Sequence, residues 1–514
     1  MADATPQAEG GIRLGQPSGR WILLAAVLGS SMAFLDSTVV NVALPTIGRS
    51  LHTSLAGLQW TVTAYTLTLA GLILLGGSLG DRMGRRRIFV IGVVWFALAS
   101  ALCGLSPDIG VLIGARALQG IGGALLTPGS LAIIQASFTS DDRPRAIGAW
   151  SGLGGVAGAA GPLLGGWLVG AVGWRWIFLI NLPLAAVVVL VSLRHVPETR
   201  DPSAHGRFDV SGALLAALAL AGITDALIEA PVSGPVLIVV PAVIGIAAGV
   251  AFVLVERRRG RPDAPTPPML PLDVFASREF TAVNVVTFVV YGALGAVFFL
   301  LVLDLQVVSG FSPLKAGLAL LPSTVLMLLL SARAGALAQR VGPRWLMTGG
   351  VLTSAAGLLL LTRVGPHASY LTDVAPGVAV FGLGLSATVA PLTATVLASA
   401  DVRHAGVASG VNNAVARAAG LLAVAGLPLA VGLTGAGLSA SAFESGFRTA
   451  MVVCAGLLVV GAVLSAVTID NNVLRPEPDR QVREPQCRTF CGVGAPPLEP
   501  ADRDATAVAG PPSH

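Results

Sequence analysis

An acidic residue inside an apolar stretch is the first candidate for chemistry in this sequence. Asp36 lies in L-D-S-T-V-V-N-V-A-L-P, in the second half of the apolar run 21–44, and Asn41 follows shortly after it. A carboxylate at membrane depth is costly unless a cation accompanies it. Burial favours the neutral acid and a nearby cation favours the carboxylate, so we expect Asp36 to exchange a proton during function. The alternative is a packing acid bonded to Ser37 and Thr38.

An arginine and a second acid are also embedded in apolar runs. Arg116 begins R-A-L-Q-G within the run 111–137, and Asp304 lies near the end of the run 281–305. A guanidinium at this depth normally faces a partner or a wet cavity, although near the end of a span it can also extend to the interface. We expect the residues that bind a proton or a substrate to be Asp36, Arg116, Asn41, Gln119 and Asp304.

One loop motif occurs twice in the chain. Residues 77–86 read G-S-L-G-D-R-M-G-R-R, and residues 335–344 read G-A-L-A-Q-R-V-G-P-R, with Gln339 in the place of Asp81. The glycines permit a tight turn, and Asp81 can face the positive end of a neighbouring helix. Membrane topology alone would explain the arginines but not the fixed Gly and Asp spacing. We expect a gating loop formed by Gly77, Asp81, Arg82, Gly84, Arg85 and Arg86.

A third motif, G-A-A-G-P-L-L-G-G, lies in the apolar run 146–168. Small residues permit close approach of two helices, and an internal proline can bend a helix. Ordinary helix packing explains the glycines but not the central Gly-Pro pair. The motif consists of Gly158, Gly161, Pro162, Gly165 and Gly166.

The sequence lacks the residue patterns of an enzyme. The only lysine, Lys315, lies in S-P-L-K-A-G, so there is no G-x-x-x-x-G-K-[ST] nucleotide loop, and H-E-x-x-H is also absent. We therefore expect no enzymatic activity, no cofactor and no metal site. Asp225, Arg333 and Arg417 also lie in apolar runs, and the sequence does not assign partners to them.

The composition requires that these residues sit in membrane helices. The 514 residues are 54% hydrophobic and only 11% charged, whereas an ordinary globular domain is about 25% charged. A membrane-spanning helix needs about 20 apolar residues. Fourteen runs are long enough: 21–44, 58–79, 88–106, 111–137, 146–168, 174–193, 210–230, 234–255, 281–305, 316–338, 343–363, 371–398, 405–430 and 446–468.

The basic residues predict the orientation of these runs. Arginine clusters such as 82–87 and 257–261 follow even-numbered runs, whereas the odd-numbered runs are followed by scattered charges. Because positively charged loops remain in the cytoplasm, both termini are expected inside. The same distribution explains the net charge of +5 without a nucleic-acid partner.

The repeated loop predicts how the chain is divided. Each copy follows the second run of a set of six, which is typical of two parallel six-helix bundles with two helices inserted between them. The expected fold is therefore an all-α polytopic membrane protein with 14 transmembrane helices. Its expected parts are a cytoplasmic tail at 1–20, a first bundle at 21–195, a linker with the two extra helices at 196–278, a second bundle at 279–469 and a disordered cytoplasmic tail at 470–514.

Together these motifs resemble the major facilitator superfamily, in its fourteen-span drug:proton antiporter branch. The resemblance covers residues 20–468 and rests on the loop at 77–86, R-A-L-Q-G-I-G-G from Arg116, the Gly-Pro motif and the stretch from Leu35. W-R-W-I-F-L-I-N-L-P and L-Q-V-V-S-G-F-S-P-L-K-A-G are also similar to this branch. The resemblance implies that Asp36 joins proton or substrate binding and Arg116 assists proton coupling. It further implies that Asp81 and Arg82 latch the two halves and that Gly161 and Pro162 favour antiport.

The resulting prediction is a monomeric, proton-coupled antiporter of a bacterial inner (plasma) membrane. By alternating access it would export amphipathic compounds, cationic or antibiotic-like, and its partners would be this substrate, protons and the lipid bilayer. Two alternatives remain open: a proton symporter that takes up a small solute on the same fold, and a membrane-embedded sensor or scaffold. The Gly-Pro motif and the inserted pair of helices argue against uptake.

Overall fold

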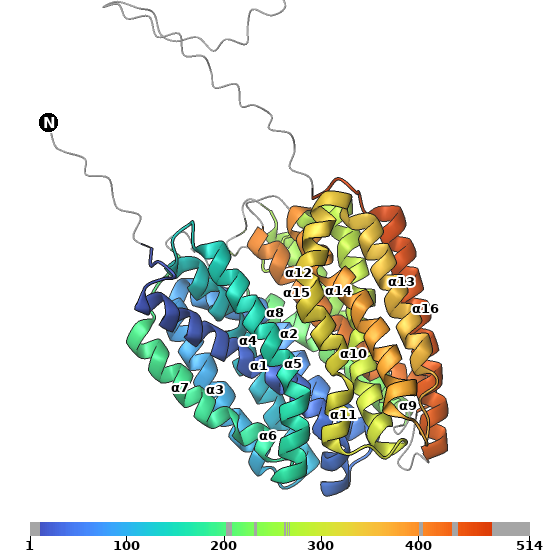
Figure 1. Ribbon diagram of the computed structural model, residues 1–514. Helices are drawn as coiled ribbons and strands as arrows, with labels where there is room; N and C mark the ends of the chain where they lie inside the picture. Colours follow the sequence, from blue (N-terminus) through green and yellow to red (C-terminus); the bar gives the residue numbers. More distant parts are fainter. Residues whose placement is uncertain are drawn as a thin grey trace, which may run out of the picture.

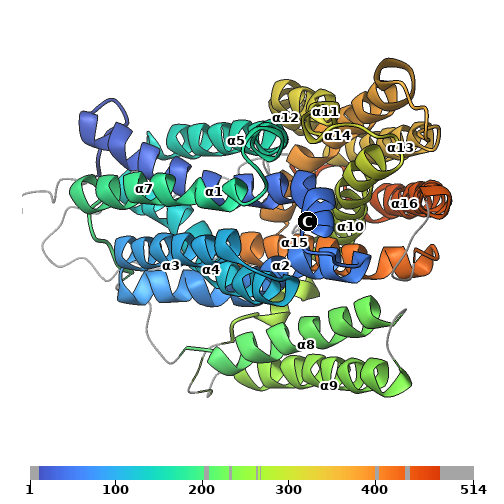
Figure 2. The same cartoon turned by 90° about the horizontal axis from the view of Figure 1, so that it is seen from below.

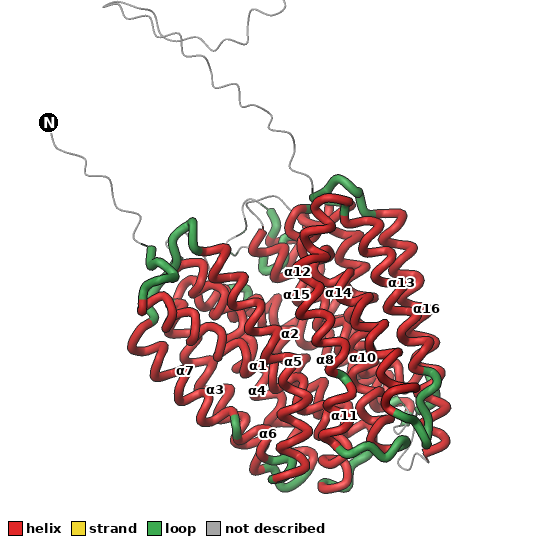
Figure 3. Tube along the Cα trace, in the orientation of Figure 1, coloured by secondary structure: helices red, strands yellow, loops and turns green. Residues whose placement is uncertain are grey.

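The computed structural model describes residues 11–201, 208–230, 234–261, 264, 266, 268–399, 405–433 and 440–474 (Figure 1). Of the predicted tails at 1–20 and 470–514, residues 1–10 and 475–514 lie outside the described residues. Across the described part the chain is nearly all helical, and the only strand pairing is a single β-bridge between Ile12 and Phe138 (Figure 3). Fourteen helical segments are long and apolar enough to cross a membrane, which confirms the predicted fold class.

The first six spans form one bundle. They are α1 (Pro17–Ser50), α2 (Leu55–Met83), α3 (Arg85–Leu105), α4 (Ile109–Ser137), α5 (Arg143–Ala171) and a sixth span broken into α6 (Trp176–Leu179) and α7 (Asn181–His195). Within this N-terminal half, α4 packs against α2 and α3, and α1 packs against α5 and α7.

The last six spans form a second bundle of the same plan. They are α10 (Arg278–Val307), a broken span made of α11 (Pro313–Ala319) and α12 (Leu321–Val341), α13 (Pro343–Leu361), α14 (Ala375–Ala398) preceded by a π-helical turn (Tyr370–Val374), α15 (Ala405–Ala430) and α16 (Ala440–Thr468). In this C-terminal half, α14 packs against α12 and α13, while α10 packs against α15 and α16.

The two repeated loops make the same turn in the two halves. Gly84 and Gly342 have φ angles of 115° and 96°, a conformation that favours glycine. A side chain at either position would also collide with a residue that follows the sixth span of its own half, Glu198 beside Gly84 and Asn471 beside Gly342. The repeat found in the sequence is therefore a structural repeat in which the chain end of each bundle covers the loop.

The two inserted helices, α8 (Val210–Glu229) and α9 (Pro235–Arg259), lie side by side on one flank of the molecule (Figure 2). Helix α8 packs on the bundles through α2 and α15, and α9 packs on α8. Asp209 accepts a hydrogen bond from the Gly212 amide at 2.6 Å and is paired with Arg259. Glu256 accepts one from the Leu270 amide at 2.7 Å, so the acids tie the pair to the linker that follows it.

The apolar core shows where the two halves meet. We call the end of the bundle that holds Pro17 and Thr468 the terminal face, and the end that holds Ser50 and Val307 the distal face. One apolar cluster joins 39–47 of α1 to α10 and the other helices of the C-terminal half, so it crosses between the halves near the distal face. A second cluster, toward the terminal face, contains residues of the N-terminal half only. The halves are therefore packed together at the distal face, and the ribbons diverge toward the terminal face (Figure 1).

Candidate functional site

The structure brings Asp36 of α1 and Arg116 of α4 into a buried ion pair. Arg116 Nη1 lies 2.5 Å from Asp36 Oδ2. The Arg116 side chain is 1% exposed and that of Asp36 is 0% exposed, so this pair is removed from water. Arg116 also donates through Nε to the Thr61 carbonyl oxygen of α2 at 3.0 Å. A guanidinium this deep in the bundle therefore has both a counter-charge and a backbone acceptor, as burial requires.

Gln119 connects this pair to three further helices through Ser100. Its Oε1 accepts from Arg116 Nη1 at 2.7 Å, and its Nε2 donates to Asp36 Oδ1 at 2.8 Å and to Ser100 Oγ of α3 at 3.2 Å. Ser100 Oγ also accepts from Asn181 Nδ2 of α7 at 3.0 Å and donates to the Phe178 carbonyl oxygen of α6 at 2.8 Å. One network thus holds α1, α2, α3, α4, α6 and α7 around the Asp36 carboxylate.

Aromatic rings enclose the guanidinium. The Arg116 Cζ lies 4.4 Å from the centre of the Tyr65 ring and 5.8 Å from that of Phe178, and both rings are buried. A cation over an aromatic face is stabilised, more so when water is excluded. The buried Tyr65 hydroxyl has no hydrogen-bond partner among the described residues. Tyr65 is therefore positioned to respond to a change in the charge of the Asp36–Arg116 pair.

The hydroxyls next to Asp36 donate hydrogen bonds to the backbone of their own helix and not to the Asp36 carboxylate. Ser37 Oγ donates to the Phe34 carbonyl oxygen at 2.8 Å, and Thr38 Oγ1 to the Leu35 carbonyl oxygen at 3.0 Å. These are local helix bonds, so the packing-acid alternative receives no support from them. Asn41 lies outside the network as well, since its Nδ2 donates to the Ser37 carbonyl oxygen at 3.3 Å and its buried Oδ1 has no partner among the described residues.

The Gly-Pro motif of α5 lies between the two halves. A side chain at Gly161 or Gly165 would collide with Thr38 or Val39 of α1, so these glycines allow α1 and α5 to touch. On the other side, a side chain at Gly166 would lie 2.6 Å from the Leu314 Cα of α11. Here backbone meets backbone at the distal face. A side chain at Gly158 would meet nothing within 4 Å.

Gly317 of α11 completes this contact between the halves. A side chain added to Gly317 would lie against the backbone carbonyl of Pro162, whose carbon would be only 2.8 Å away. The conformation therefore depends on the absence of side chains on both helices at one crossing. Gln59 and Gln306 add polar contacts between the halves, since they donate to backbone oxygens of Val424 and Val42 at 2.8 and 2.9 Å.

The predicted gating loop lies at the terminal face. Asp81 forms an ion pair with Arg85 at 2.7 Å within the loop, and its carbonyl oxygen accepts from the Asp201 amide at 2.9 Å. Arg82 stacks on Phe208, with 4.5 Å from its Cζ to the ring centre. Arg86 lies 3.6 Å from Glu198. Gly77 packs on α4, where a side chain would be 3.6 Å from Pro128.

Asp304 is not brought to the Asp36 network. It lies on α10 near the distal face, where it interacts electrostatically with Glu444 and Arg448 of α16. Its side chain is fully buried, and neither carboxyl oxygen has a hydrogen-bond partner among the described residues. An ionised carboxylate in that position would be unsolvated and without a hydrogen-bond donor, which favours the neutral form of Asp304.

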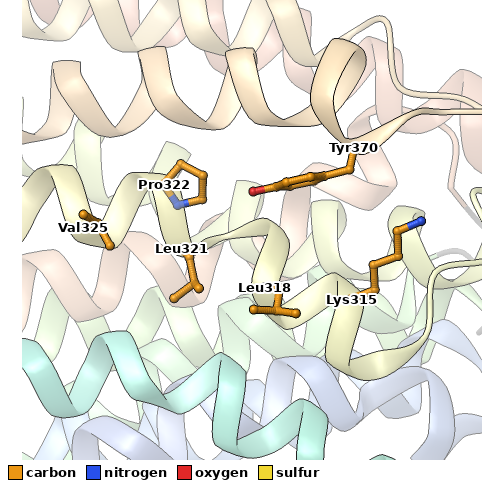
Figure 4. A pocket seen from close by; sticks show the side chains of 6 residues that line it. All are labelled: Lys315, Leu318, Leu321, Pro322, Val325 and Tyr370. Atoms are coloured by element: carbon orange, nitrogen blue, oxygen red, sulfur yellow. The ribbon is translucent and has the colours of Figure 1, made fainter.

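A pocket of about 400 Å³ lies at the distal end of the C-terminal half. It is lined by Lys315, Leu318, Leu321, Pro322, Val325 and Tyr370, with the Tyr370 hydroxyl directed toward Pro322 (Figure 4). None of the predicted site residues lines it. In the described part of the chain no group of three His, Cys, Asp or Glu residues could hold a metal ion.

Four members of the network, Thr61, Tyr65, Ser100 and Asn181, were not singled out from the sequence. Asn181 left the clearest signal, because it is a lone amide in an apolar stretch and directly follows the break between α6 and α7. Ser100 and Tyr65 lie in helices where a hydroxyl can equally bond its own backbone. Only the packing of α2, α3 and α4 shows that they face Asp36.

Comparisons with known proteins agree with this architecture. The model of the family named Major Facilitator Superfamily matches residues 26–224 and 196–425. The puromycin resistance protein pur8 of Streptomyces alboniger is 37% identical over 477 residues, which cover 88% of this chain and 92% of that protein. The tetracenomycin C resistance and export protein of Streptomyces glaucescens is 35% identical over 409 residues, 78% of this chain and 74% of that protein.

Solved structures show the same fold at lower identity. A bacterial homologue of the human lysosomal transporter Spinster has a TM-score of 0.61 and 18% identity, and the match covers 90% of this chain and all of that one. The POT family transporter PepTSo has a TM-score of 0.63 and 16% identity, over 87% of this chain and 97% of its own. With its two six-helix halves and its relatives among antibiotic resistance transporters, this chain belongs to the Major Facilitator Superfamily.

Proposed function

We propose that this chain is a proton-coupled antiporter that exports amphipathic drugs or antibiotics across the bacterial plasma membrane by alternating access. The names of its relatives support the cargo: they include resistance proteins for puromycin and tetracenomycin C and the multidrug resistance protein Stp of Mycobacterium tuberculosis. With both termini in the cytoplasm, as the basic loops predict, the packed distal face would be the outer one.

The observation that carries the proton coupling is the buried Asp36–Arg116 pair. Asp36 is held by two donors, Arg116 Nη1 and Gln119 Nε2, and both act on the ionised form of the acid. A proton on Asp36 would remove the charge that offsets Arg116, while the bonds of Arg116 to Thr61 and Gln119 could persist. Protonation therefore weakens the attachment of α1 to α4 and leaves the rest of the network in place. Helix α1 therefore has two arrangements relative to α4, and protonation of Asp36 selects between them.

The pair also sets how proton and substrate exclude each other. In this conformation the Asp36 side chain is 0% exposed, so a substrate between the halves does not reach the carboxylate. Exclusion then acts through the shape of the bundle: α1 carries Asp36, and the same helix packs on α5 and α10. A shift of α1 on protonation would displace α5, which packs on it. The crossing between α5 and α11, where the distal face is closed, would then change.

The remaining predicted residues take supporting roles in this proposal. The glycines at 161, 165, 166 and 317 let α5 close against both α1 and α11. The loop with Asp81 and Arg82 stabilises the N-terminal half at the terminal face. Asp304 is a second acid whose neutral form is tied to the closed distal face. Asn41 lies one turn from Asp36 on the same helix and is assigned no further role.

The experiment is expression in a pump-deficient bacterial host, with a growth-inhibition panel of amphipathic compounds, followed by transport in proteoliposomes. We expect raised resistance and export that a protonophore abolishes. Inward accumulation driven by an inward proton gradient would establish the symport alternative instead. No flux linked to protons for any compound that the panel selects would favour the sensor or scaffold alternative.

A further inference from the structure

A second arginine lies at mid-membrane depth and lacks a counter-charge. Arg417 is near the middle of α15, where its side chain is half-buried. Its Nε donates to Asn413 Oδ1, one turn earlier on the same helix, at 3.0 Å. None of the ion pairs between described residues includes Arg417. A guanidinium in a membrane span is expensive, so an unpaired one marks a functional site.

Arg417 lies on a helix that packs at the junction of the two halves. The helix surface beside it packs on α2 and α10: a side chain at Gly410 would meet Leu74 of α2, and Gly295 of α10 lies against Gly420. Arg417 interacts electrostatically with Tyr65 of α2 and Tyr291 of α10. Asn413, on the same stretch of surface, is exposed although it lies within a span. The Asn413–Arg417 surface is therefore not fully covered where α15 packs on α2 and α10.

The charged side chains inside the two bundles do not balance. The charge of Asp36 is already offset by Arg116 in the buried pair. Asp304 lies far along α10 toward the distal face, and burial without a hydrogen-bond partner among the described residues favours its neutral form. Arg417 therefore leaves the interior with an excess positive charge. Such a site attracts an anion and repels a cation.

We propose that Arg417, together with Asn413, binds the acidic group, a carboxylate or an acidic phenol, of the compound that the protein exports. A planar guanidinium presents a fork of donors that matches a carboxylate, and the Asn413 amide next to it supplies one further donor. Nε is already engaged by Asn413, so both terminal nitrogens of the fork remain for the ligand. The proposal names the substrate class of the export function proposed above and rests on it.

An anionic substrate differs from the cationic compounds considered in the sequence analysis. Considered alone, Asp36 favoured a cationic substrate, but the ion pair with Arg116 removes that attraction. The membrane potential, negative inside, also drives an anion outward and so assists its export. A bound anion would by electrostatics alone favour protonation of Asp36. Proton and substrate must therefore exclude each other through the movement of the helices, with Tyr65 interacting with both arginines.

The charge at Arg417 can be measured without any substrate. Ser409 is exposed on the same helix, about 12 Å from Arg417 along the helix axis. The full chain with Ser409→Cys, and with Cys487 and Cys491 replaced by Ser, is reacted with an anionic and a cationic methanethiosulfonate of similar size. Cys103 and Cys454 stay because both are buried, and the same background without Ser409→Cys gives the residual reaction.

The measured quantity is the ratio of the anionic to the cationic reaction rate. We expect Arg417→Gln to lower this ratio by about three- to tenfold, because one charge at this distance acts oppositely on the two reagents. Arg417→Lys keeps the charge and should keep the ratio. Arg333→Gln removes an exposed arginine of a different C-terminal span, α12, and should leave the ratio unchanged. An unchanged ratio in Arg417→Gln would overturn the proposal.

Recognition of the acid is tested with one dye in two forms, tetramethylrhodamine and its methyl ester, bound to the protein in nanodiscs. The parent should bind the carboxylate form about tenfold tighter or more, and Arg417→Gln should lose this preference while Arg417→Lys retains part of it. Equal affinity of the parent for acid and ester would contradict the proposal. Both measurements are made without transport, so an anion site can stand even if proton coupling at Asp36 fails, and coupling can stand if the anion site fails.

Discussion

Replacement of both members of the Asp36–Arg116 pair should cost less stability than the sum of the two single replacements. Asp36→Asn keeps the size of the side chain but leaves the Arg116 guanidinium, which is 1% exposed, without its carboxylate. Arginine cannot give up its proton to relieve this. Breaking a buried pair in this way costs about 3–5 kcal/mol in the free energy of unfolding.

The reverse substitution should be milder. Arg116→Gln leaves an acid that Gln119 still bonds at 2.8 Å and that can become neutral by taking up a proton. We expect a loss of about 1–3 kcal/mol, which grows as the pH rises because the unpaired acid then has to remain charged or take up a proton from a more basic solution. In the double variant no buried charge is left. Its loss should fall short of the sum of the single losses by about 2–3 kcal/mol.

The assay is equilibrium unfolding of the purified protein in mixed micelles, with the exposure of Cys103 to a thiol dye as a local readout. Cys103 is fully buried, and its Sγ lies 3.6 Å from Gln119 Oε1, so it reports on the network directly. Asp304→Asn is the matched control. Asp304 is also fully buried, but unlike Asp36 it has no hydrogen-bond partner among the described residues, so its replacement should cost under about 1 kcal/mol. Strictly additive losses, or an Asp36→Asn loss no larger than the control, would refute the ion pair as described.

Three further outcomes follow from the same structure. Gly317→Val should insert normally yet lose transport, because its side chain would overlap the backbone of α5 at the distal face. Gly170→Val, where a side chain meets nothing within 4 Å, should retain transport. Transport retained by Gly317→Val and lost by Gly170→Val would exclude the crossing as a gate. In intact cells a cysteine at 108 should react with an impermeant thiol reagent and one at 142 should not, whereas inverted labelling would reverse the orientation taken from the basic loops. Removal of 475–514, which is rich in proline and charge, should leave export within about twofold, and complete loss would reveal a function for that segment.

The sequence predicts the parts of this protein that depend on local composition. Fourteen apolar runs became fourteen spans, since length and hydropathy alone decide whether a helix can cross a bilayer. Asp36 and Arg116 stood out because a charge in an apolar run has few explanations. The neutral polar members of the network did not stand out, since a serine such as Ser100 is common in membrane helices and gains its meaning only from the neighbours that tertiary packing supplies.

The positions of charged side chains around the helix axis were equally hidden from sequence. Asp304 was a second candidate after Asp36, yet it faces α16 and not the network, because the rotation of α10 is set by its contacts with α15 and α16. Arg417 had no assignable neighbour until α15 was placed beside α2 and α10. Charge in a span can be read from one sequence, whereas its partner requires the fold.

The central claim, that Asp36 couples proton movement to export, is tested most directly in proteoliposomes with a pH dye inside. A gradient of a compound selected by the growth-inhibition panel is imposed in the absence of a pH gradient, and the movement of both compound and protons is followed over about pH 6–9. In the parent, downhill movement of the compound should drive protons in the opposite direction. In Asp36→Asn the compound should still move downhill while the proton movement is lost. Proton movement in the Asn variant equal to that of the parent would contradict the account and would direct attention to Asp304.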